Sequence, residues 1–120
     1  MSEKVFTNKQ NIIEIVYDGV HDIKRSNKVV AELKTELSKL GEQKKHKKIM
    51  FNLTKLGKTD RRARENVINI ARNWDYYKIA VYGANVFNKV LAELIIFASG
   101  KNNKIKIFST RNKAVEWLNK

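Results

Sequence analysis

The chain has 120 residues, of which 42% are hydrophobic and 31% charged, which suits one compact domain and excludes a disordered or low-complexity segment. Its 25 Lys and Arg outnumber 12 Asp and Glu, so the formal net charge is +13. The lack of cysteine excludes disulfides, thiolate metal sites and a cysteine nucleophile.

Strand and helix patterns alternate in the first half of the chain. The β-branched and aromatic run at 12–17 predicts a buried strand that ends at Asp18-Gly19, preceded by a short edge strand at Val5-Phe6. Apolar residues then recur every three or four positions from 22 to 40, which predicts an amphipathic helix capped by Gly41. A second strand is expected at 49–53.

The second half repeats this alternation. Thr59 or Asp60 can cap a helix that runs to Trp74, and a strand follows at 77–82. The chain is completed by an apolar helix at 84–99, a strand at 104–108 and a helix that begins at Ser109-Thr110. The order predicts a single α/β domain over 1–120, with a core at about 12–118, a largely parallel central sheet and no internal linker.

The third helix, at 84–99, is apolar around most of its circumference. Its inward stripe is predicted to be Phe87, Leu91, Leu94, Ile95 and Ala98. At about 100° per residue, further apolar residues fall on one flank or toward the outer side, namely Val86, Val90, Ile96 and Phe97. This wide face leaves three alternatives: a helix wedged between sheet and neighbour, a dimer or partner surface, or the wall of an apolar ligand pocket.

Positive charge is concentrated at 42–64, which holds nine basic and two acidic residues. Such a cluster is typical of a protein with an anionic partner. The candidates are a basic loop of Lys44, Lys45, Lys47 and Lys48, and an anion- or partner-binding group of Lys58, Thr59, Arg61, Arg62 and Arg64. Exposed amides at the start of the second helix could hold a phosphate or carboxylate, although a solvated helix surface explains the same residues.

Residues 52–59 lie between a strand and a helix, as a phosphate-binding P-loop does. That loop needs glycine where Asn52 stands, and no later strand ends in the aspartate expected near magnesium. We therefore interpret 52–59 as an ordinary connection from strand to helix. Nucleotide hydrolysis is not expected.

Catalytic and metal-binding constellations are missing from the sequence. His21 and His46 fall in polar turns, and no Ser-His-Asp order or HExxH motif can be drawn. We expect a protein that is not an enzyme and needs no metal or cofactor. The start of the chain has no apolar leader and no run is long enough to cross a membrane, so a cytoplasmic location is expected.

Three blocks of the sequence resemble one family: 52–60, 78–84 and the closing Phe-Ser-Thr followed by Ala-Val-Glu-Trp-Leu at 108–118. Together they resemble the small bacterial STAS-like domains, which are related to anti-sigma-factor antagonists and to STAS/SEC14-like proteins. The resemblance implies a four- or five-stranded mixed sheet with about four helices mainly on one side, and a regulatory binding module. Relatives are phosphorylated on a serine where this chain has Arg61, so Thr59 is the nearest candidate phosphoacceptor.

Three functions remain as hypotheses. The first is a regulatory protein-interaction module that binds an acidic protein or a second copy of itself. The second, suggested by the SEC14-like resemblance, is binding of a lipid or another apolar anionic small molecule. The third is nonspecific nucleic-acid binding through the basic surface, since no motif for specific recognition accompanies the charge.

Overall fold

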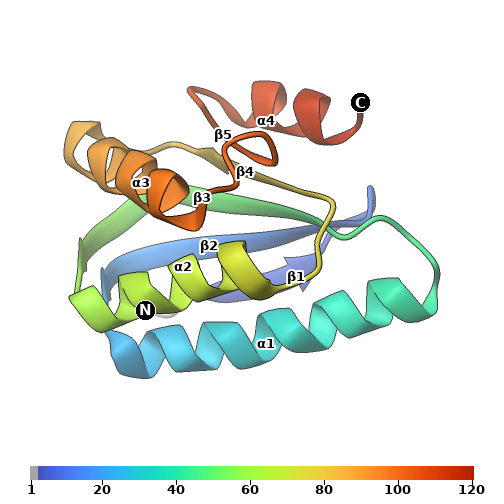
Figure 1. The fold of residues 1–120 in the computed structure, drawn as a ribbon, viewed down its shortest axis with the longest axis horizontal. Coiled ribbons are helices and arrows are strands. Elements are labelled where there is room, and N and C mark those ends of the chain that lie inside the picture. Colours follow the sequence, from blue (N-terminus) through green and yellow to red (C-terminus); the bar gives the residue numbers. More distant parts are fainter. Residues whose placement is uncertain (1–2) are drawn as a thin grey trace.

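Five strands and four helices alternate along residues 3–120, the part of the chain described by the computed structural model (Figure 1). The elements in chain order are β1 (Lys4–Thr7), β2 (Ile12–His21), α1 (Ile23–Glu42), β3 (Lys48–Thr59), α2 (Arg61–Asn73), β4 (Lys78–Tyr82), α3 (Val86–Ser99), β5 (Ile105–Phe108) and α4 (Arg111–Leu118).

The strands form one mixed sheet in the order β1-β2-β3-β4-β5. β1 is antiparallel to β2, and the remaining neighbours are parallel. Because each parallel strand is added on the same side of the previous one, right-handed crossovers bring α1, α2 and α3 to one face. α4 covers the opposite face (Figure 1). The predicted mixed, mostly parallel sheet with helices mainly on one side is confirmed.

Alternating side chains of β2 supply two separate cores. Ile13 and Ile15 pack with α1 and α2 in the larger core, which contains the fully buried Leu33. Ile12 points the other way and packs with Ala114 of α4 in the smaller core. A strand buried on both faces reads as a continuous apolar run, which is the pattern at 12–17.

β2 and β3 extend further than their apolar runs predict. β2 continues past Gly19 to His21, and β3 continues to Thr59, so the expected connection at 52–59 is in fact strand. The two extensions pair with each other, with irregular register, from Asp18 opposite Lys55 to His21 opposite Thr59. Their close approach requires glycine, because a Cβ on Gly57 would lie 3.0 Å from the backbone of Gly19.

The end of α1 also differs from its prediction. Gly41 lies inside the helix, which continues to Glu42 and is capped by Gln43. The left-handed residue that turns the chain is Lys44, with φ of 56°. The amides of Lys44 and Lys45 bond to the Gly41 and Leu40 carbonyls, so the end of the helix is satisfied without a glycine cap.

Candidate functional site

α3 has a capping residue at each end. The Asn85 side chain accepts a hydrogen bond from the amide of Asn88 at 2.8 Å, and Gly100 follows the helix in the left-handed conformation with φ of 71°. These are standard devices for starting and ending a helix. The caps set where the 14-residue helix begins and ends, whereas packing decides which of its sides faces the sheet.

The inward side of α3 is polar or small at three positions. Asn88, Ala92 and Ser99 are the buried residues of the helix. The Asn88 amide donates to the Leu56 carbonyl at 3.1 Å, which fastens the first turn of α3 to the extension of β3. The Ser99 hydroxyl donates to the Ile96 carbonyl of its own helix at 2.7 Å.

The outward side of α3 carries large apolar residues. We call these residues the α3 outer face: Val86, Phe87, Val90, Leu94 and Phe97. Val86 and Phe97 are 83% and 84% exposed. The face extends about 16 Å along the helix axis. An exposed set of this size and continuity is unusual on a soluble domain and typical of a binding surface.

Two parts of the prediction for this helix are wrong. Phe87, Leu94 and Ala98 were expected to face inward, yet all three are exposed. Ile96 was expected toward the outer side, yet it is partly buried and packs against the larger core. The predicted exposure of Val86, Val90 and Phe97 agrees with the structure. Ala92 is buried on the inward side of α3, where its small side chain allows the helix to lie close to the sheet.

The positive residues at 42–64 do not form one surface. The basic loop lies where the chain enters β3, whereas Lys58, Arg61 and Arg62 lie where it leaves β3 and enters α2 (Figure 1). A strand of this length separates the two groups by about 35 Å. Lys47 pairs with Asp75 at 3.1 Å and Lys48 donates to the Asn119 side chain at 2.9 Å, so part of the loop has structural partners.

The start of α2 is less open to anions than the sequence suggests. Asp60 caps the helix by accepting from the Ala63 amide at 2.8 Å, and it also accepts from the Ile23 amide at 3.1 Å. A carboxylate therefore already occupies the position proposed for a bound phosphate. Thr59 is partly buried at the end of β3, where its hydroxyl accepts from Arg64. Arg61 and Arg62 are exposed.

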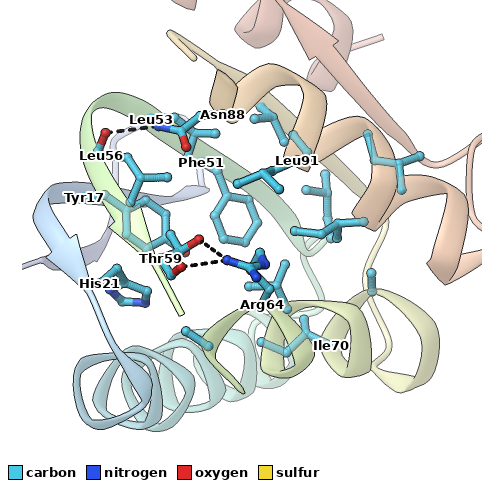
Figure 2. Close-up of a pocket in the computed structure, with 18 of the residues that line it drawn as sticks. Tyr17, His21, Phe51, Leu53, Leu56, Thr59, Arg64, Ile70, Asn88 and Leu91 are labelled. Carbon is cyan, nitrogen blue, oxygen red and sulfur yellow. Dashed lines mark hydrogen bonds between the residues drawn. The ribbon is translucent and has the colours of Figure 1, made fainter. Parts of the chain in front are cut away.

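A cavity of about 90 Å³ lies between the sheet, α2 and α3 (Figure 2). Its walls are mainly apolar, with Phe51 and Leu53 from β3, Ile70 from α2 and Leu91 from α3 among them. Arg64 enters from α2, and its Nη1 donates to the carbonyl and hydroxyl oxygens of Thr59 at 2.6 and 2.8 Å. Figure 2 shows this guanidinium beneath the Phe51 ring.

His21 adds a second polar group to the same wall. The residue is 3% exposed, and Figure 2 shows it on the other side of Thr59 from Arg64. Its Nδ1 lies 3.2 Å from a Glu3 carboxylate oxygen, whereas its Nε2 is buried with no hydrogen-bond partner among residues 3–120. An unsatisfied buried group of this kind costs about 1–3 kcal/mol. Next to it, burial raises the pKa of Tyr17 far above its usual value.

The opposite face of the sheet has an ion pair between the buried Glu14 and the exposed Arg111. Glu14 is buried, and its Oε2 accepts from Arg111 and from the Asn8 amide, both at 2.8 Å. These two donors satisfy the carboxylate, and the pair joins α4 to β2. Its role is therefore structural. Sequence reasoning missed this pair because Glu14 lies within an apolar run and Arg111 is 97 residues away.

Neither a candidate metal site nor a membrane-spanning helix is found among residues 3–120. No group of three or more His, Asp or Glu side chains is placed to hold a metal ion. No helix in this part of the chain is long and apolar enough to cross a membrane.

Two solved structures share this fold across nearly the whole chain. One is an uncharacterized protein of the DUF3478 family with a SpoIIAA-like fold from Shewanella loihica PV-4, with 11% identity, a TM-score of 0.70 and coverage of 98% of this chain and 92% of that one. The other is the anti-sigma factor antagonist SpoIIAA in its unphosphorylated form, with 11% identity, a TM-score of 0.70 and 98% coverage of both chains. The chain is therefore a SpoIIAA-like, or STAS-like, domain in fold.

The sequence itself matches one family. A profile described as a domain of unknown function, DUF7793, covers residues 6–120, so the chain belongs to this family. No curated protein matches the chain.

Proposed function

We propose that this domain is a non-catalytic regulatory module that binds an acidic protein through the α3 outer face. The observation that supports this most strongly is the exposure of large apolar side chains on α3. Val86 and Phe97 are exposed, although Leu91, Ile95 and Ile96 already supply an apolar inward side. Exposing large apolar side chains to water is unfavourable unless another surface covers them. A partner would gain the free energy of their burial.

The charge around this face favours an acidic partner. Lys89 and Glu93 are both exposed on α3, and the Arg72 guanidinium donates to the Ala98 carbonyl at the C-terminal end of this helix. The hydrogen bond from Asn88 to Leu56 sets the other end of α3 beside the extension of β3, two residues before Lys58. An apolar centre with a mainly basic rim complements a partner that has an apolar centre and a carboxylate rim.

A second copy of the chain is the less favoured occupant. Each copy carries a net charge of +13, so pairing two copies brings like charges together, while an acidic protein gains attraction. Nucleic acid would satisfy the charge of the rim but would not cover Val86, Val90 and Phe97. The SpoIIAA-like fold supports the same class of function by analogy with an anti-sigma factor antagonist.

The test is photocrosslinking in cells of the source organism, with a photoreactive phenylalanine at position 97. The matched control has the same group at Lys34, which is exposed on α1. We expect position 97 to crosslink one acidic protein that position 34 does not reach. The purified pair should then bind, and the Val90→Asp variant should lose that binding while retaining its fold.

A charge comparison tests the basic rim. The double variant Lys58→Glu, Lys89→Glu should weaken binding of the purified partner and reduce its dependence on salt. The control Lys28→Glu, Lys34→Glu makes the same charge change at exposed positions of α1 and should have little effect. Equal crosslinking from positions 34 and 97 would refute the docking surface. Crosslinks from position 97 only to a second copy would replace the acidic partner with a homodimer.

A further inference from the structure

We propose that the cavity between the sheet, α2 and α3 binds a small carboxylate with a short apolar tail, and that Arg64 pairs with the carboxylate. This site uses the inward side of α3, whereas partner docking uses the α3 outer face. The two proposals therefore stand or fall separately.

Arg64 supplies a positive charge without a protein counter-ion. No carboxylate of residues 3–120 lies within 4.0 Å of its guanidinium, although other basic side chains in this part of the chain do form such pairs. Both hydrogen bonds of Arg64 use Nη1. A guanidinium has five N–H donors in a fork that matches a carboxylate, so donors remain for a ligand.

His21 indicates independently that a polar partner is missing at this wall. Its Nδ1 faces Glu3, and its buried Nε2 has no partner in the described part of the chain. Thr59 lies between His21 and Arg64 in Figure 2, and all three line the cavity. A ligand carboxylate held by Arg64 would sit at the end of the cavity where this unsatisfied nitrogen lies.

The remaining walls define the rest of the ligand. Val67, Ile70, Leu91 and Ile95 from the two helices face Phe51 and Ile79 from the sheet. The volume of about 90 Å³ is well below that of a pocket for a drug-sized ligand, which is at least about 300 Å³. Since a dry cavity of about 150 Å³ takes one benzene, the tail has room for about three or four carbons. A short branched or linear acid fits this description, and a phospholipid does not.

The experiment titrates the purified protein with 3-methylbutanoate and follows the methyl NMR signals of Val67, Ile70, Leu91 and Ile95. Three comparison compounds separate the contributions: 3-methylbutanamide has the same shape without charge, acetate has the charge without the tail, and octanoate has a tail too long for the cavity. We expect 3-methylbutanoate to bind most tightly and to shift these four residues. This comparison uses the unchanged chain and does not depend on any variant folding.

Variants then test the individual residues. Arg64→Gln should weaken binding of 3-methylbutanoate about tenfold or more, because an ion pair is replaced by a hydrogen bond from an uncharged donor. The matched control Arg61→Gln removes an exposed guanidinium of the same helix and should leave the affinity unchanged. Ala92→Leu places extra carbons in the cavity and should abolish binding while the protein remains folded.

Three results would overturn the proposal. Equal affinity for the acid and the amide would show that Arg64 does not pair with the ligand. Tighter binding of octanoate would replace the short acid with a fatty acid whose chain leaves the cavity. No shift of the cavity methyl signals with any of the acids would show that the cavity takes no carboxylate.

Discussion

Helices α1 and α3 lie on the same face of the sheet and differ in the side chains that they expose to water. α1 buries Val29, Leu33, Leu37 and Leu40 and presents Lys and Glu to water, as an ordinary amphipathic helix does. α3 has apolar residues on both sides: Leu91, Ile95 and Ile96 are partly buried, and the α3 outer face presents valine, leucine and phenylalanine to water. The comparison indicates that α1 serves mainly to stabilise the fold, whereas the α3 outer face is available to a protein partner.

The largest difference should follow from deleting the same side chain on each helix. Leu33→Ala removes a fully buried leucine from α1 and should lower the free energy of unfolding by about 3 kcal/mol through lost burial and a residual cavity. Leu94→Ala removes an exposed leucine from α3 and should change it by less than about 0.5 kcal/mol. Urea unfolding of both variants measures the difference. Equal losses would mean that Leu94 is buried in solution.

A smaller effect is expected at the one strongly anchored polar position of α3. Asn88→Ala should cost about 1–2 kcal/mol, because it removes the side-chain donor to the carbonyl of the partly buried Leu56. Asn69→Ala is the control, since Asn69 is exposed on α2 and bonds only to the Asn73 side chain of its own helix. If both variants unfold at the same urea concentration as the parent chain, Asn88 does not anchor α3.

Sequence patterns predicted the elements whose buried residues follow a clear local pattern. The order of strands and helices, the mixed sheet and the apolar stripe of α1 follow from short β-branched runs and from a clear three- or four-residue repeat. The extensions of β2 and β3 were not predicted, because residues 18–21 and 54–59 are mostly polar or glycine, with one apolar residue each, and these segments pair with each other. Pairing between distant segments is not visible in local composition.

The orientation of α3 was predictable only in part. Apolar residues surround the helix, so periodicity cannot decide which side faces the sheet. Asn88, Ala92 and Ser99 carry the missing signal: small or polar residues at steps of four and seven mark a side that packs closely. The cavity and the unpaired Arg64 could not be predicted, because they depend on how α2 and α3 approach the sheet.

Partner docking requires that Val86, Val90 and Leu94 of α3 face outward in the isolated protein. Methyl NMR with a soluble gadolinium chelate measures this directly, since the chelate broadens only signals that it can approach. At low protein concentration, the methyl signals of Val86, Val90 and Leu94 should be strongly broadened, while those of Val29 and Leu33 stay sharp. Equally sharp signals from both helices would rule out partner docking at the α3 outer face, because α3 would then have no free apolar surface.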